Sequence, residues 1–147
     1  MKYITIFLLL ILLSSCSRLS TQYFSIEVPR NWHSVERTDK SVKLERKNSR
    51  NVTIYITANK VPKGLTLEEN WKDYYRFVTF DKKVINQFEK TYNGVVWNGV
   101  ITETFIKTEY MFTIKNNVRC IIIYGTEKND FEKGYGEFQS FMENVKL

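Results

Sequence analysis

The sequence predicts an α+β domain, with a largely antiparallel sheet of about six to seven strands flanked by two helices. Three observations support this fold class. Short segments with alternating apolar residues fill most of the chain, the pairs Asn93-Gly94 and Asn116-Asn117 each separate two such segments, and two stretches carry apolar residues at helical spacing. The order strands, helix, strands, helix is typical of helices packed on one sheet.

The first predicted strands are short and come before the first helix. Residues 23–28 alternate between apolar and polar side chains until Pro29 interrupts the pattern. Further strands are predicted at 34–37, 41–47 and 51–59. The strand at 51–59 has the clearest period of two in the chain, with one face formed by Val52, Ile54, Ile56 and Ala58.

An amphipathic helix is predicted from residue 67 to about residue 80. Thr66 and Glu69 have the spacing of a capping box, in which each side chain bonds to the other residue's backbone N–H. The apolar stripe follows at helical spacing and consists of Leu67, Trp71, Tyr74 and Val78. Such a helix is expected to lie over the sheet.

Two hairpins are predicted after this helix. Residues 83–92 and 95–106 flank Asn93-Gly94, a pair that favours the positive φ angles of a type I′ turn. Residues 109–115 and 118–126 flank Asn116-Asn117. The continuous run CIIIYG at 120–125 predicts a strand that is covered on both faces, and therefore one in the middle of the sheet.

A second amphipathic helix is predicted over 130–145. Its apolar stripe consists of Phe131, Tyr135, Phe138, Met142 and Val145. Gly134 and Gly136 weaken its first turns by up to about 1 kcal/mol each.

The N-terminus has the pattern of a signal peptide over residues 1–15. Lys2 precedes an apolar run at 4–13, and Ser14 and Ser15 follow. A transmembrane helix needs about 20 apolar residues, so this run is too short to span a bilayer. We expect the segment to be removed.

The residues LSSC at 13–16 resemble the bacterial lipobox. The resemblance implies that Cys16 receives diacylglycerol, becomes the first mature residue and carries a further acyl group such as palmitate. Residues 16–22 would then be a lipidated tether and 23–147 the folded domain. Residue 17 is Ser rather than Asp, which resembles the pattern of Gram-negative lipoproteins that are sent to the outer membrane. Such a protein would face the periplasm. The alternative is an ordinary secretory signal, with Cys16 free or paired to Cys120.

Composition narrows the function classes. The chain has 147 residues, with 22 Lys and Arg against 16 Asp and Glu and a formal charge of +6. The basic residues are scattered rather than arranged in a stripe, so nucleic-acid binding is not indicated. Cys120 lies in an apolar run, where a lone thiol most often behaves as a small buried hydrophobe.

No catalytic, metal or cofactor site is predicted. A hydrolase needs a nucleophile beside a base, yet His33 is the single histidine and no Gly-x-Ser-x-Gly motif is present. A zinc site needs several converging His, Cys, Asp or Glu donors, and the carboxylates lack EF-hand spacing. Neither a P-loop nor a dinucleotide fingerprint occurs.

Two features are candidate binding surfaces. The basic turn with Arg46, Lys47 and Arg50 could meet phosphates or lipid headgroups, and the alternative is a soluble hairpin tip. Tyr75 and Phe77 fall on the two shoulders of the first helix's apolar stripe and could line an aromatic groove. The alternative for them is packing over the sheet edge.

Several segments together resemble the PsbP/DcrB-like group. These are YFSIEVPRNW at 23–32, LTLEENW at 65–71, the Asn93-Gly94 hairpin and EFQSFMENVKL at 137–147. The similarity covers nearly all of the mature chain but consists of core and turn positions. Asn31 stands where the group usually has Gly before Trp, a variant that a left-handed turn position tolerates. The resemblance implies an antiparallel sheet flanked by helices, and binding or assembly factors rather than enzymes.

Three functions remain open at this stage. The first is a non-catalytic accessory or binding protein, held in the cell envelope by lipid on Cys16 and docking another envelope protein. The second is an immunity or protective lipoprotein that blocks a toxin, which a neighbouring toxin gene would indicate. The third is a small hydrolase, which would have to depend on His33.

The lipid anchor makes a direct prediction. Mass spectrometry of the protein from the membrane fraction should show a mature N-terminus at Cys16 with an acyl-derived mass increment. Replacing Cys16 by Ser should release the protein from vesicles, because two or more acyl chains anchor stably whereas a bare domain does not. A mature chain that begins at another residue would contradict the lipobox interpretation.

Overall fold

The computed structural model describes residues 17–147, except for the side chain of Arg50. The predicted signal peptide and Cys16 lie outside the described residues, so both remain predictions. Among residues 17–147, neither helix has the length and apolar character needed to span a bilayer.

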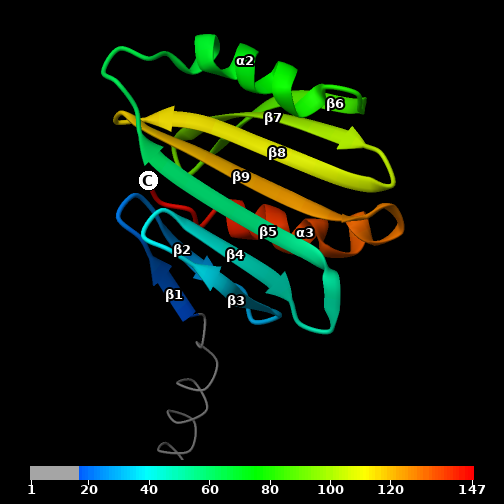
Figure 1. Cartoon of the computed structure of the whole chain (residues 1–147). Helices are drawn as coiled ribbons and strands as arrows, with labels where there is room; N and C mark the ends of the chain where they lie inside the picture. The colour runs from blue at the N-terminus through cyan, green and yellow to red at the C-terminus, as the bar shows by residue number, and fades with distance from the viewer. Residues whose placement is uncertain (1–16) are drawn as a thin grey trace, which may run out of the picture.

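Seven antiparallel strands form the main sheet (Figure 1). Its order is β3-β4-β5-β9-β8-β7-β6, and every neighbouring pair is antiparallel. The strands are β3 (Trp32–Arg37), β4 (Ser41–Arg46), β5 (Ser49–Lys60), β6 (Lys83–Tyr92), β7 (Val95–Glu103), β8 (Ile106–Lys115) and β9 (Val118–Glu127). Together with the two helices described below, this confirms the predicted α+β class.

The central strand is β9, as the run CIIIYG predicted. The side chains of Cys120, Ile122 and Tyr124 are completely buried on one face of the sheet. Ile121 packs on the other face. Both apolar faces of such a strand are covered only when the strand lies in the middle of a sheet.

A second, two-stranded sheet precedes the main one. Strand β1 (Ser17–Ser20) pairs antiparallel with β2 (Ser25–Val28), so pairing begins inside the segment 16–22 that was expected to be a tether. Ser25 also exchanges two backbone hydrogen bonds of 2.9 Å with Lys146. The beginning and the end of the described chain are therefore joined by β2.

Turn residues fix the hairpins. Asn93 and Gly94 have φ angles of 52° and 72°, and Asn116 and Asn117 have 54° and 60°. Two consecutive positive φ angles are the signature of the type I′ turn, whose twist matches paired strands.

The link between β7 and β8 differs from the prediction. The sequence pattern extends a strand to residue 106 and starts the next at 109, whereas the turn lies at Thr104 and Phe105. Thr104 hydrogen-bonds to Ile106 through its backbone N–H at 2.9 Å, and its hydroxyl accepts from the Ile106 N–H at 3.4 Å. This local side-chain bond competes with the sheet ladder and ends the strand early.

Helix α2 (Leu67–Thr79) covers part of one face of the sheet, here named the α2 face. The Thr66 hydroxyl accepts from the Glu69 N–H at 3.3 Å, which confirms Thr66 as the N-cap. The Glu69 carboxylate accepts from the Thr66 hydroxyl at 2.8 Å instead of from the backbone N–H that the capping box predicts. Trp71 and Val78 pack against Val100 on β7 and Phe112 on β8. The helix contacts β7 and β8, so β5 and the end of β9 lie beyond it on this face.

Helix α3 (Phe131–Met142) covers the opposite face, here named the α3 face, and follows a short 3-10 turn, η1 (Lys128–Asp130). It ends three residues before the predicted boundary because the last residues pair with β2. Phe138 stacks on Tyr124 with ring centroids 4.8 Å apart. A Cβ on Gly134 would lie 2.6 Å from the Tyr124 hydroxyl, so glycine permits the close approach of helix and sheet.

Candidate binding surface

The part of the α2 face beyond helix α2 contains a groove of about 470 Å³. Strands β5, β8 and β9 form its floor, and the β7–β8 turn forms part of its wall. Residues that line it include Phe105, Ile106, Thr108, Tyr110, Ile123 and Gly125.

The groove exists because three small residues align across three strands. Gly125 on β9 pairs with Thr53 on β5 and with Thr108 on β8. No side chain in this row is larger than Thr, so the row is a depression between larger neighbours. Along the strands the groove extends from the Tyr110–Ile123 pair to the Ile106–Glu127 pair, a step of four residues or about 13 Å.

Three exposed phenylalanines lie at one end of the sheet, and one of them, Phe105, lines the groove. Phe77, Phe80 and Phe105 are 79%, 81% and 84% exposed. Phe77 and Phe80 lie at the end of α2, and Lys83 at the start of β6 pairs with Glu103, two residues before Phe105. The end of α2 and the β7–β8 turn therefore lie at the same end of the sheet (Figure 1). We name these three side chains the phenylalanine patch.

The apolar character of this end is not limited to aromatic residues. Val84, Ile85 and Ile106 are each partly exposed there as well. Single exposed apolar side chains need no explanation, whereas a group of them beside a groove is typical of an interaction site.

Lys82 supplies a positive charge next to Tyr110, one of the residues that line the groove. Its ammonium group donates to the Tyr110 hydroxyl at 2.8 Å and lies 4.9 Å from the centre of the Tyr110 ring. Among residues 17–147 no carboxylate forms an ion pair with it. Glu127, the one charged side chain in the lining of the groove, accepts a hydrogen bond of 2.5 Å from Asn51.

The two aromatic residues singled out in the sequence have different surroundings. Tyr75 is half-buried, and its ring meets Trp71 edge-on with centroids 5.6 Å apart. Phe77 points into solvent. Packing therefore explains Tyr75, while Phe77 belongs to the phenylalanine patch. Phe80 and Phe105 were missed because the sequence pattern assigned them to the helix end and to a strand.

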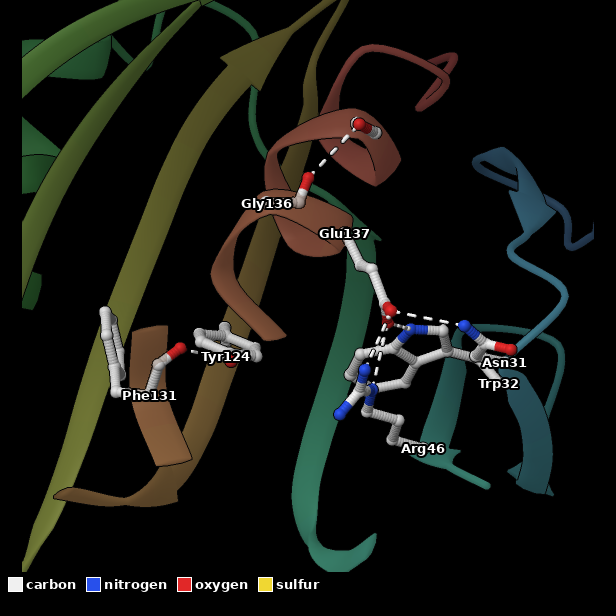
Figure 2. A network of polar contacts seen from close by, with 8 residues as sticks. Asn31, Trp32, Arg46, Tyr124, Phe131, Gly136 and Glu137 are labelled. Carbon is white, nitrogen blue, oxygen red and sulfur yellow. Dashed lines mark hydrogen bonds and ion pairs between the residues drawn. The ribbon is translucent and has the colours of Figure 1, made fainter. Parts of the chain in front are cut away.

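The basic turn is on the other side of the sheet, and its Arg46 is occupied by an ion pair (Figure 2). The Arg46 guanidinium donates to both oxygens of Glu137 on α3, at 3.1 and 2.9 Å. The same carboxylate accepts from Trp32 Nε1 at 2.8 Å and from Asn31 Nδ2 at 3.3 Å. This network connects β3 and β4 to α3, so we interpret Arg46 as structural.

The remaining residues of the predicted basic surface do not join the aromatic ones. Lys47 is exposed in the β4–β5 turn, and the side chain of Arg50 lies outside the described part of the structure. Since Arg46 contacts α3 and Phe77 lies on α2, the two predicted surfaces are on opposite faces of the sheet (Figure 1).

His33 lines a polar hollow of about 410 Å³ that also contains Glu45, Arg46 and Ser49. His33 pairs with Glu45 through the β3–β4 ladder, but within the described residues no side-chain hydrogen bond joins the His33 imidazole to Ser49 or Glu45. Nucleophile activation requires such a contact between nucleophile and base. Residues 17–147 also contain no group of three potential metal ligands.

Glu109 is a fully buried acid on the α3 face of β8. Burial raises the pKa of its carboxyl group to about 7, and the Tyr135 hydroxyl, Lys90 and Lys107 oppose part of that shift. Tyr135 approaches the carboxylate without reaching hydrogen-bond geometry, so both oxygens lack a hydrogen-bonding partner among the described groups. No cavity opens onto this acid among the described pockets, so we interpret it as part of the α3 interface.

The arrangement of sheet and helices is a PsbP/Mog1-like fold, which confirms the fold implied by the sequence resemblance. Over 89% of this chain and 91% of that protein, it is similar to cyanobacterial PsbP (CyanoP) from Synechocystis sp. PCC 6803, with a TM-score of 0.66 and 12% identity. The chain matches no protein-family model and no curated protein by sequence.

Two further solved structures share the fold. The Ran-binding protein Mog1p from Saccharomyces cerevisiae has a TM-score of 0.59 and 9% identity, covering 90% of this chain and 96% of that one. Protein PA94 from Pseudomonas aeruginosa, a putative regulator of unknown function, has a TM-score of 0.56 and 9% identity, covering 86% and 93%. At such low identity the similarity establishes the fold alone.

The Glu137 network predicts a stability effect. Burial of Glu137 acts to raise its pKa, but hydrogen bonds from Arg46, Trp32 and Asn31 hold the pKa below its ordinary value. Replacing Glu137 by Ala should lower the free energy of unfolding by about 1–3 kcal/mol, because Arg46 and the Trp32 N–H lose their partner. The wild-type contribution should be lost as pH falls below about 4.5, which urea unfolding at several pH values would measure.

Glu132 on the same helix provides the matched control. Its side chain is 75% exposed and pairs with Lys107 at 3.0 Å. Exposed pairs contribute about 0–1 kcal/mol, so replacing Glu132 by Ala should cost less. Equal losses for the two variants would contradict the structural role of Glu137.

Glu109 predicts the opposite dependence on pH. A buried carboxyl with a raised pKa stabilises the folded state below pH 4.5, and this contribution is lost as pH rises to about 7. Glu109→Gln removes the titration, so the variant should gain up to about 3 kcal/mol relative to the wild type across this range. Urea unfolding at pH 5 and pH 8 measures the change, with the exposed Glu89→Gln as control. A pH-independent difference would show that Glu109 does not titrate in this range.

Proposed function

We propose that this protein is a lipid-anchored, non-catalytic accessory protein of the cell envelope that binds another envelope protein through the phenylalanine patch. In a Gram-negative host it would be held at the outer membrane by Cys16 and face the periplasm. The anchor rests on the lipobox and the binding role on the α2 face.

The exposure of Phe77, Phe80 and Phe105 is the observation that carries the proposal. Keeping a phenylalanine in water forgoes about 1.5–3 kcal/mol relative to burying it. Aromatic residues are enriched at protein interfaces, and a few of them usually supply most of the binding energy. Three such side chains at one end of the sheet therefore favour a protein partner.

The direction of the patch also favours a protein partner over the anchoring membrane. Ser17, the residue after the proposed anchor, begins β1, which lies at the opposite side of the molecule from α2 and β6 (Figure 1). Since β1 is paired with β2, only a short spacer would separate the lipid from the domain. The phenylalanine patch would then point away from the membrane, where a periplasmic partner could reach it.

The fold is compatible with this role. Mog1p, which shares the fold, is a Ran-binding protein, so the fold can serve protein binding. The hydrolase alternative gains no support from the surroundings of His33, where a nucleophile–base contact is missing among the described residues.

In-cell photo-crosslinking tests the proposal. A photoreactive amino acid at position 77, 80 or 105 should give a discrete crosslinked protein, because these side chains would be buried in the interface. The same probe at Val35, a partly exposed apolar residue of edge strand β3, is the matched control. Combining Phe77→Ser and Phe80→Ser should abolish the product formed from position 105, as loss of two aromatic anchors weakens binding by at least about tenfold. A product from position 35 alone, or from no position, would refute the proposed surface.

A further inference from the structure

We propose that the end of the domain next to Cys16 binds the anionic phospholipid headgroups of the membrane that holds the lipid anchor. The exposed cations Arg18, Arg30 and Lys47 lie at this end, which is here named the basic end. The assignment rests on the proposed lipid anchor, because the acyl groups would bring this end to the bilayer. It involves neither the phenylalanine patch nor the groove.

Backbone contacts place the three cations close together. Ser17, the first residue after the proposed anchor, pairs with Val28, and Arg30 follows two residues later. The Lys47 N–H then donates to the Asn31 carbonyl at 2.6 Å. Two hydrogen-bonded steps of about 5 Å and three residues of chain at about 3.5 Å each keep Lys47 within about 20 Å of Ser17. The start of β1 and the β4–β5 turn therefore lie on the same side of the molecule, opposite α2 (Figure 1).

The formal charge of the chain is distributed unevenly. Residues 17–50, from β1 to the start of β5, contain eight Lys and Arg against four Asp and Glu, which is a formal charge of +4. Residues 51–147 contain thirteen Lys and Arg against twelve Asp and Glu, which leaves +1. The segment that follows the anchor therefore carries most of the positive charge of the domain.

The acidic groups near the basic end do not cancel its charge. Glu27 lies opposite Arg18 in the β1–β2 ladder and is the one acidic residue on these two strands. Neither Arg18 nor Lys47 forms an ion pair with a carboxylate among residues 17–147. Two other carboxylates of this region already have cationic partners, namely Glu45 with Lys43 at 3.4 Å and Glu137 with Arg46 at 2.9 Å. Positive charge at the basic end is thus left for an external anion.

The position of the anchor favours the membrane over other anionic partners. Arg18 is two residues from Cys16, so its Cα lies within about 7 Å of the residue that would carry the acyl groups. Because β1 is already paired at Ser17, a domain anchored through Cys16 has its basic end at the headgroup layer. The tether makes contact with the headgroups intramolecular, so even weak charge interactions are formed at high effective concentration. Guanidinium groups also match the geometry of phosphate oxygens, to which they donate two hydrogen bonds.

Screening by salt gives this contact a supporting role. At physiological ionic strength the Debye length is about 8 Å, so a few exposed cations orient an anchored domain without holding an acyl-free one. The release expected for Cys16→Ser agrees with this. An anchored domain that rests on its basic end presents α2 and the phenylalanine patch on the side away from the bilayer (Figure 1).

Vesicle flotation tests the dependence on lipid charge. The protein used is the mature chain from residue 16 with Cys16→Ser, which contains every described helix and strand. At an ionic strength of about 0.01 M, where the Debye length is about 30 Å, it should bind vesicles that contain phosphatidylglycerol. Vesicles of zwitterionic phosphatidylcholine alone should bind it at least about tenfold more weakly.

Two matched double variants locate the surface. Arg18→Gln combined with Lys47→Gln should weaken binding to the phosphatidylglycerol vesicles by at least about tenfold, because each basic residue near an anionic bilayer strengthens binding by about fivefold. Lys63→Gln combined with Lys72→Gln removes the same charge from exposed positions before and on α2. This control should lose much less binding, because its charges lie on the far side of the molecule.

NMR of the acylated, unsubstituted protein in nanodiscs keeps the result independent of how the variants fold. A paramagnetic label on the lipid headgroups should broaden the amide signals of Arg18, Arg30 and Lys47 and spare those of the phenylalanine patch. Absence of vesicle binding, equal binding to the two kinds of vesicle, equal losses in the two double variants, or broadening confined to the phenylalanine patch would overturn the proposal.

The outcomes also separate the basic end from the proposed anchor. Acylation at Cys16 together with vesicle binding that ignores lipid charge would overturn the role of the basic end and leave the proposed function intact. A mature chain that begins at another residue, together with charge-dependent vesicle binding, would refute the anchor and support the basic end as a membrane-binding surface.

Discussion

The central strand β9 is apolar on both faces, and the rest of the structure depends on covering it twice. On the α3 face the cover is complete, since Cys120, Ile122 and Tyr124 are fully buried under α3 and its neighbours. On the α2 face the cover is partial, because α2 packs on β7 and β8 and meets β9 only near Ile121. The sheet is thus covered completely on the α3 face and incompletely on the α2 face. The incomplete layer is where apolar side chains remain exposed, and exposed apolar groups of this kind are typical of interaction sites.

Local chemistry in the sequence predicted most of the fold. The asparagine-containing turn pairs, the Thr66 cap and the run CIIIYG each act within a few residues, and all three features occur as predicted. The boundary at Thr104 was missed because a single threonine hydroxyl ended the strand against the apolar pattern. For the same reason the exposure of Phe105 was not predicted. Inside a strand, buried and exposed side chains are expected to alternate, whereas Phe105 lies in a turn.

The site itself depends on register, which no local pattern specifies. Thr53, Thr108 and Gly125 are unremarkable along the sequence and form a groove only because β5, β9 and β8 are adjacent and aligned at these residues. Arg46 and Glu137 are 91 residues apart, so the sequence offered Arg46 as a free basic residue although the fold pairs it. The surroundings of Lys82 depend on the fold in the same way, since its ammonium donates to the hydroxyl of Tyr110, 28 residues further along the chain. A glycine in a central strand was the one signal of the groove that the sequence contained.

The groove and the phenylalanine patch are physically connected through Phe105, which lines the first and belongs to the second. A partner that buries this ring, as proposed above, would therefore also lie over one wall of the groove. The turn that carries Phe105 is held by two hydrogen bonds between Thr104 and Ile106, so the ring is presented from a fixed backbone. Burying a side chain whose backbone is already ordered costs less conformational entropy than ordering a flexible segment.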